Sequence, residues 1–157
     1  MKDLLLLIFK PVSCTELRAY HDDLEQEIWD FLHRHIQSIF SRDVATYKAT
    51  TAEDLSLYEW FVTPHRQDGL DFHLFMIDHS WAGTDGDFRY DLWEPRVQIY
   101  GEGSGVVTAV VSYTFMLSTA TGAGIQHRSH NESRVLVKDA AGWKVVHVHK
   151  SPVSGNP

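Results

Sequence analysis

Four side chains that could bind a ligand or transfer a proton lie close together near the end of the sequence. Glu132 and Arg134 fall in one strand-like run, and His147 and His149 fall in the next. A guanidinium can hold an anion, imidazoles can exchange protons near neutral pH, and a carboxylate can pair with either group. The pattern therefore predicts either a ligand pocket or a polar contact between subunits.

The two runs, residues 132–138 and 143–150, are predicted to form a β-hairpin, because the segment 139–142 carries the Asp and Gly of a tight turn. Antiparallel pairing would place Lys138 opposite Trp143, Leu136 opposite Val145, Arg134 opposite His147 and Glu132 opposite His149. Because side chains alternate along a strand, these residues would share one face, and Val135, Val137, Val146 and Val148 would share the other.

Arg134 is the expected fixed charge of this group. It lies in the middle of a strand, and a buried guanidinium cannot lose its proton, so it needs an acceptor. Glu132 is the nearest acceptor, with a bound anion or water as the alternative. One interpretation is therefore a cross-strand network that satisfies its own charges, and the other is a pocket in which Arg134 binds a ligand. The histidines 147 and 149 fit the first interpretation better.

Other chemistries fit the residues less well. Zinc could use His147 and His149 with His127 or His130, but Arg134 beside His147 would repel a metal ion, so we expect no metal. Asp68 and Asp71 could act as general bases. Asp71, however, opens a predicted helix, where an acid also favours the helix dipole. No cofactor is expected either.

The composition limits the class of protein. A formal charge of -7 with scattered Lys and Arg argues against nucleic-acid binding. Cys14 is the only cysteine, which excludes an intrachain disulfide and indicates a reducing, cytoplasmic location. The chain contains no apolar run of the ~20 residues that a membrane span requires. We expect one domain over residues 16–151, a lead-in over 1–15 whose apolar run only weakly matches a signal peptide, and a flexible tail over 152–157.

The predicted elements are helices first and strands afterwards. The segment 13–16 has the spacing of a capping box, and apolar residues at helical spacing, with His35 among them, predict a helix to about Ser41. Asp43 can cap a short second helix through Tyr47, and 55–62 is predicted to be a strand. A third helix is expected over 70–81, followed after a turn at 83–86 by strands at 88–100 and 106–119.

This order predicts an α+β fold in which helices cover one face of an antiparallel sheet. The strands 106–117 and 135–148 look apolar on both faces. The face without helices would then need a cover, so we expect a homodimer or larger ring that associates through this outer face.

Several motifs resemble the association, or hub, domain of calcium/calmodulin-dependent protein kinase II. They are Asp43-Val44-Ala45-Thr46-Tyr47, Gly69-Leu70-Asp71-Phe72-His73, Glu94-Pro95-Arg96, Glu132-Ser133-Arg134-Val135 and the run from Gly142 to His149. The resemblance covers residues 16 to 151. It implies the cone-shaped fold of the nuclear transport factor 2-like superfamily, which SnoaL-like polyketide cyclases and ketosteroid isomerases share.

The resemblance also implies a pocket inside the cone. The family lines this pocket with the histidine of the Asp-Phe-His motif and with arginines, which match His73 and Arg134. A third basic position is Lys150, and a fourth falls at about Thr114, where the charge is lost. The sequence contains no kinase Gly-rich loop or catalytic loop.

Two functions follow from different classes. The first is a stand-alone hub-like homo-oligomerisation domain that keeps a small-molecule pocket, with an anion as one candidate ligand, and has no catalysis of its own. The second is a SnoaL-like or ketosteroid-isomerase-like enzyme acting on a polyketide- or steroid-like substrate, with Arg134 orienting it and His73 or a histidine of the last strand transferring a proton. An unpaired acid in the pocket would favour the enzyme, and a fully paired network would favour the hub.

Overall fold

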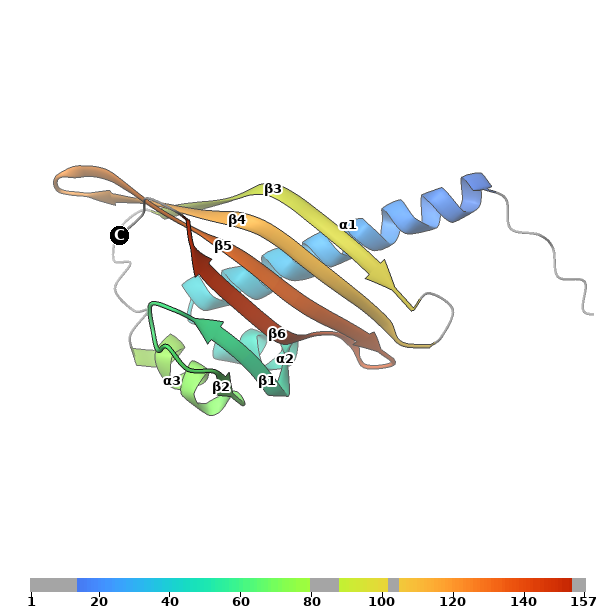
Figure 1. Cartoon of the computed structure of the whole chain (residues 1–157), viewed down its shortest axis with the longest axis horizontal. Coiled ribbons are helices and arrows are strands. Elements are labelled where there is room, and N and C mark those ends of the chain that lie inside the picture. Colours follow the sequence, from blue (N-terminus) through green and yellow to red (C-terminus); the bar gives the residue numbers. More distant parts are fainter. Residues whose placement is uncertain (1–13, 80–87, 102–104, 154–157) are drawn as a thin grey trace, which may run out of the picture.

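The computed structural model describes residues 14–79, 88–101 and 105–153. Within these residues, three helices and six strands follow one another. Their bounds are α1 (Cys14–Phe40), α2 (Val44–Thr50), β1 (Thr51–Glu59), β2 (Gln67–Asp68), α3 (Asp71–His79), β3 (Phe88–Tyr100), β4 (Val107–Thr121), β5 (Gly124–Asp139) and β6 (Gly142–Pro152). Figure 1 shows the strands as one strongly bent sheet.

The strand order across the sheet is β2-β1-β6-β5-β4-β3. Every neighbouring pair is antiparallel except β1 and β6, which run parallel. The sheet is therefore mixed, and the prediction of a wholly antiparallel sheet is wrong at this one pair. The long connection between β1 and β6, which contains α3 and the four strands β2 to β5, permits the parallel pairing.

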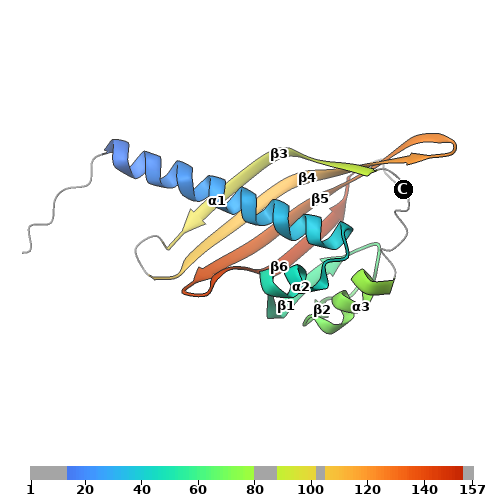
Figure 2. The ribbon, with the colours of Figure 1, turned by 180° about the vertical axis from the view of Figure 1, so that it is seen from behind.

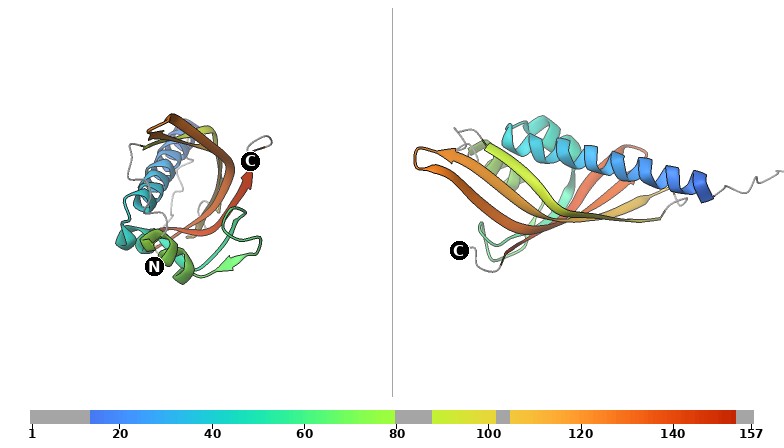
Figure 3. Two further views of the ribbon diagram at one scale, coloured as in Figure 1. Left: turned by 90° about the vertical axis from the view of Figure 1, so that its left-hand side faces the viewer. Right: turned by 90° about the horizontal axis from the view of Figure 1, so that it is seen from above.

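Helix α1 lies across the concave face of the sheet, and the sheet curls around it (Figures 2 and 3). Its buried positions, Leu24, Ile28, Phe31, Leu32, Ile36 and Ile39, recur at helical spacing and pack into the main core. On the other side of the core, Ala109, Val111, Leu136 and Val145 project inward from the sheet. The apolar stripe read from the sequence is thus the stripe that holds the helix inside the cone.

The local signals around the helices are largely confirmed. Asp43 is the N-cap of α2 and accepts a hydrogen bond of 2.9 Å from the backbone N–H of Thr46. Helix α1 ends one residue before the predicted Ser41, and α3 covers residues 71–79 of the predicted 70–81 segment. The capping serine at position 13, the turn at 83–86 and most of the lead-in and tail lie outside the described residues.

Two strands begin several residues before their predicted starts. Strand β1 starts at Thr51, four residues before the predicted strand. Strand β5 starts at Gly124, eight residues before the predicted Glu132, because the polar run from Gln126 to Asn131 pairs with β4 over its full length. Strand β3 has the predicted bounds.

The hairpin prediction is half correct, because a bulge changes the register of β5 and β6. The pairs of Lys138 with Trp143 and of Leu136 with Val145 are as predicted. Beyond them the register shifts by one residue, so Arg134 faces Val148 and Glu132 faces Lys150. The predicted pairs of Arg134 with His147 and of Glu132 with His149 are wrong. A bulge reverses the side chains that follow it, so Val148 and Lys150 point into the cone while His147 and His149 point outward.

The outer face of the sheet is also less apolar than expected. In one part of β4 and β5 the outward-facing residues are Val110, Val135 and Val137. Toward the other end of the same strands the outward residues are Ser112, Thr114, Asn131 and Ser133. The expectation of an apolar outer face therefore holds only for the valine half.

Candidate functional site

The inside of the cone contains a cluster of buried ionisable side chains, centred on Arg134. The side chain is 3% exposed and lies on β5, one residue from the outward-facing Ser133. Its Nε donates to Glu132 Oε1 at 2.6 Å and to the Tyr113 hydroxyl at 3.1 Å. Its guanidinium also contacts His35 Nε2 of helix α1, at 2.7 Å. Arg134 thus ties the sheet to the helix inside it.

The contact with Arg134 fixes the protonation of His35. Because a guanidinium can only donate, Nε2 of His35 must be the acceptor, and Nδ1 carries the proton. That proton points to Thr50 Oγ1 at 2.8 Å, and Thr50 in turn donates to the Thr46 carbonyl at 2.8 Å. Burial, followed by the charge of Arg134, lowers the pKa of the His35 imidazole well below its ordinary value. His35 is therefore a neutral, oriented acceptor.

Glu132 is the second centre of the cluster, and it is 4% exposed. Besides Arg134, the Tyr113 hydroxyl donates to its Oε1, and His130 Nε2 lies 3.0 Å from its Oε2. Lys150 Nζ lies 3.8 Å from the same Oε2. Burial alone would raise the pKa of this carboxyl, but Arg134 and then Lys150 outweigh it and hold the pKa well below the usual range.

Glu59 extends the cluster to strand β1. Lys150 Nζ donates to its Oε1 at 2.5 Å, and His73 Nε2 lies 3.5 Å from its Oε2. Burial opposes ionisation of Glu59, yet Lys150 and His73 lower its pKa to about 2. The buried residues thus include two cations, Arg134 and Lys150, and two carboxylates, Glu59 and Glu132, so their formal charges balance.

His73 occupies the far end of the cluster, on helix α3. Its Nδ1 hydrogen-bonds the hydroxyl of Tyr47, a side chain with no exposed surface. Burial lowers the pKa of His73, although Glu59 partly offsets this shift. Burial also raises the pKa of the Tyr47 hydroxyl. Tyr47, His73 and Glu59 therefore form a buried relay in which both outer groups orient the imidazole.

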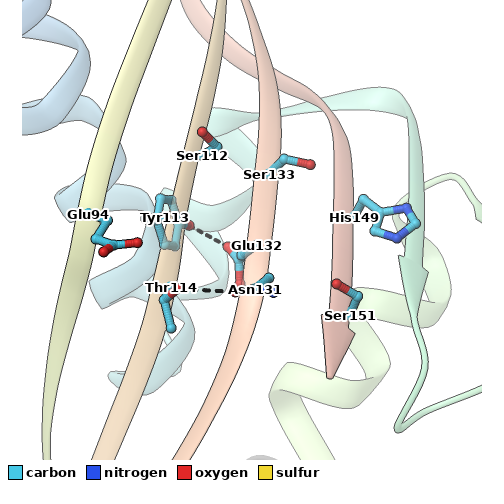
Figure 4. A pocket seen from close by; sticks show the side chains of 9 residues that line it. All are labelled: Glu94, Ser112, Tyr113, Thr114, Asn131, Glu132, Ser133, His149 and Ser151. Carbon is cyan, nitrogen blue, oxygen red and sulfur yellow. Dashed lines mark hydrogen bonds between the residues drawn. The ribbon is translucent and has the colours of Figure 1, made fainter. Parts of the chain in front are cut away.

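A second candidate region is a shallow hollow on the outer face, with a volume of about 300 Å³. Its lining residues carry mainly hydroxyl and amide groups, with two carboxylates and one imidazole: Glu94, Ser112, Tyr113, Thr114, Asn131, Glu132, Ser133, His149 and Ser151. Figure 4 shows Glu94 of β3 on one side and His149 of β6 on the other. Glu94 has a left-handed backbone (φ 51°) beside a register shift between Trp93 and Arg96.

The structure separates the predicted site residues into two groups. His73, Glu132, Arg134 and Lys150 meet inside the cone, whereas Thr114, His147 and His149 lie outside it. Thr114 Oγ1 donates to Asn131 at 3.0 Å, and His147 Nδ1 lies 2.9 Å from Ser56 Oγ. The prediction that His147 flanks Arg134 is therefore wrong, because Arg134 faces Val148, and Thr114 lies at the outer hollow instead of inside the cone. Next to Thr114, it is Tyr113 that points inward and fills the space beside Arg134.

Sequence reasoning missed several residues of the cluster, although signals existed for some of them. His35 stands inside the apolar stripe of α1, and Glu59 continues the inward alternation of Leu55 and Leu57. A polar residue in such a pattern must find a buried partner. Nothing local to the sequence indicates that these two meet Arg134 and Lys150.

Among the described residues, no group of three or more His, Cys, Asp or Glu side chains is arranged to hold a metal ion. Of the described helices, none combines the length and apolar character needed to cross a membrane.

The comparisons with known proteins place this chain in a family. Residues 24–154 match the model of the calcium/calmodulin dependent protein kinase II association domain. The chain belongs to this family. A calcium/calmodulin-dependent protein kinase type II of Caenorhabditis elegans is 27% identical over 140 residues, which cover 88% of this chain and 18% of the relative. The chain thus spans less than a fifth of that kinase.

Solved structures give the same result. The CaMKII hub of S. rosetta has a TM-score of 0.69 and 25% identity, over 82% of this chain and 95% of the hub. An NTF2-like protein with a cystatin-like fold from Novosphingobium aromaticivorans has a TM-score of 0.70 and 19% identity, over 92% of each chain. These likenesses confirm the predicted cone-shaped α+β fold, which nuclear transport factor 2-like proteins share.

Proposed function

We propose that this chain is a hub-like self-association domain without catalysis of its own, acting in the cytoplasm. The observation that carries the proposal is the uncovered outer face of the sheet. All three helices lie on the concave side or at its rim, whereas none of the described elements packs on the outer side of β3 to β6 (Figure 3). On that side Val110, Val135 and Val137 form an apolar patch with the polar hollow beside it. An apolar centre with a polar margin is typical of a protein interface.

The buried cluster supports a structural role over a catalytic one. Each buried carboxylate already has a cationic partner within 2.6 Å, since Arg134 binds Glu132 and Lys150 binds Glu59. A general acid or base needs a pKa near the working pH, whereas these pairs hold both carboxyl pKa values below the ordinary range. The cluster is therefore suited to fastening helix α1, β1 and α3 to the inner face of the sheet.

The small-molecule pocket implied by the family remains part of the proposal, with a condition on its ligand. Because the buried charges balance, an anion entering the cone would add an uncompensated charge. It would have to displace Glu132 from Arg134 or bind together with a proton, and His73 could accept that proton. An uncharged ligand would avoid this cost, so the cluster favours a neutral ligand over a carboxylate.

An isomerase- or cyclase-like enzyme is the second candidate, and the relay of Tyr47, His73 and Glu59 is the observation that favours it. A histidine oriented by a carboxylate and a tyrosine can transfer a proton. All three residues are at most 3% exposed, however, so a substrate would require α3 to move away. Turnover of a steroid-like or polyketide-like ketone by wild-type protein, lost in His73→Gln, would establish this function instead.

Light scattering tests the self-association directly. We expect a mass of at least twice the 18.0 kDa of one chain at micromolar concentration. Val135→Glu should weaken the association by roughly a hundredfold, because burying an unpaired carboxylate costs about 3 kcal/mol. Ala49→Glu introduces the same charge on the exposed side of α2 and serves as the matched control. A wild-type mass near that of one chain, or equal masses for both variants, would contradict the proposal.

A further inference from the structure

Strands β4 and β5 form a two-stranded arm, residues 117–130, that extends past the end of β6. Their ladder continues to the pair of Thr121 with Gly124, while the last pair of β5 with β6 joins His130 to Pro152. Figures 1 and 3 show the arm projecting from one end of the sheet. On the side away from β4, no strand of the described chain pairs with β5 between Gly124 and Arg128. This segment therefore presents a row of backbone donors and acceptors to its surroundings.

The other edges of the sheet have features that prevent pairing with another strand. Strand β3 carries Pro95, the left-handed Glu94 and a register shift between Trp93 and Arg96. Strand β2, at the opposite edge, is only two residues long. Bulges, prolines, charges and short strands are the usual protections of an exposed edge.

The arm edge has neither a bulge nor a proline, and Arg128 is the one formally charged side chain of the segment 124–128. The segment from Gly124 to Arg128 contains no proline and no carboxylate, and its ladder with β4 runs without a register shift. Ile125, which is 70% exposed, makes the segment more apolar than a purely solvated edge. The contrast with β3 indicates that this edge is kept open for a strand to pair with it.

We propose that the arm edge pairs with the arm edge of a second copy of this chain, antiparallel about a twofold axis, with Gln126 opposite its own copy. The proposal rests on the proposed self-association and names a second contact for it. Facing residues of antiparallel strands must point to the same side of the sheet, so a twofold axis places one residue opposite itself. An axis at His127 or Arg128 would oppose two basic side chains, whereas an axis at Gln126 places Ile125 opposite His127 and Gly124 opposite Arg128.

This contact has a consequence for the size of the assembly. The arm lies at one end of the sheet, and the valine patch lies on its outer face, so both contacts can form on one chain. A chain with two different twofold contacts builds assemblies larger than a dimer. The arm would then join dimers made through the outer face.

Site-specific disulfide formation tests the register. In a Cys14→Ser background of the full chain, Gln126→Cys should form a disulfide-linked dimer under mild oxidation, because the two cysteines face each other. Arg128→Cys is the matched control in the same arm. Two copies of residue 128 would be offset by four residues, on the order of 13 Å, which is too far for a disulfide. Both positions are exposed, and an unchanged melting temperature would show that both variants fold.

The possible results separate the two proposals. A disulfide-linked dimer in Gln126→Cys and none in Arg128→Cys would support the arm contact. Cross-linking at neither position, or equally at both, would overturn it. If the wild type is a dimer by light scattering and residue 126 does not cross-link, only the arm contact fails. If the wild type is a monomer, the proposed function fails as well.

Discussion

Both faces of strand β5 carry polar residues, but the two faces use them differently. On the inner face Glu132 and Arg134 are at most 4% exposed and make charge-assisted contacts with each other, Tyr113 and His35. On the outer face, one residue away, Asn131 and Ser133 line an open hollow. The inner polar groups are satisfied by partners within the same chain, whereas the outer groups remain accessible to a second molecule.

The difference shows that the face of the sheet to which a polar residue points decides what its side chain does. Inside the cone a charge must be paired, because low solvation makes an unpaired charge costly. Outside it, water can satisfy the same groups until another chain covers them. Disrupting the polar contacts of one face should therefore leave the contacts of the other face intact.

The largest effect is expected for Arg134→Leu. Removing the guanidinium leaves Glu132 buried without its closest cation, and this should lower the free energy of unfolding by about 3 to 5 kcal/mol. Urea denaturation measures the loss. Ser133→Ala, the neighbouring change on the outer face, should stay within about 0.5 kcal/mol. Equal effects of the two variants would contradict the division between the faces.

Acidification should weaken the inner face next. His35 and His73 have pKa values below those of the unfolded chain, so the unfolded state binds more protons once the pH falls below about 6.5. The free energy of unfolding is therefore highest above that pH. It decreases toward pH 5 by up to about 1.4 kcal/mol per pH unit for each histidine. Glu132 and Glu59 have depressed pKa values, and their contribution is lost as the pH falls from about 5 to 2.

Chemical denaturation between pH 7 and pH 5 measures the first of these losses. His73→Gln should reduce the slope in this range, because one of the two titrating groups is gone. His21→Gln, a change at an exposed position of α1, is the control and should leave the slope unchanged. A stability that is constant from pH 7 to pH 5 would show that the two buried histidines are not the neutral groups described here.

A smaller effect is expected for Glu132→Gln in the presence of acetate. The substitution removes the internal carboxylate from Arg134 and leaves a net positive cluster that an external carboxylate can neutralise. Acetate at a hundredfold excess over its Kd should then stabilise the variant by about 2.7 kcal/mol relative to its own acetate-free state. Wild-type protein should show no shift in melting temperature. A shift in the wild type alone would mean that the anion pocket is open despite Glu132.

The smallest effect is expected for Thr114→Val. The side chain lies on the outer face and contacts Asn131 there, so its loss should change the free energy of unfolding by less than about 0.5 kcal/mol. It should also leave the acetate response of Glu132→Gln unchanged when the two substitutions are combined. A strong effect on that response would place Thr114 in the inner pocket after all.

Much of the fold could be predicted because its signals are local. The stripe of α1, the Asp43 cap and the alternation in β4 each depend on residues close in sequence. The motifs shared with the association domain family then indicated how these elements are arranged. The parallel pairing of β1 with β6 joins residues far apart in sequence, and periodicity carries no information about such a pair.

The site could be predicted only in part, because one bulge decides which residues of β6 face inward. Perfect alternation from Trp143 would place His147 and His149 in the cone, and the extra residue in β6 places Val148 and Lys150 there instead. The partners Glu59 and His35 were missed because their contacts span about 90 to 100 positions in the sequence. Arg134 and Glu132 were found because their pairing is local.

A double-mutant cycle on Arg134 and Glu132 tests most directly whether the inner cluster is a closed structural pair. The free energies of unfolding of wild type, Arg134→Leu, Glu132→Leu and the double variant give the coupling between the two side chains. We predict a coupling of about 2 kcal/mol or more, with the double variant more stable than either single variant, because no charge is then left unpaired. A coupling below about 0.5 kcal/mol would show that Arg134 is not held by Glu132 and is free for a ligand.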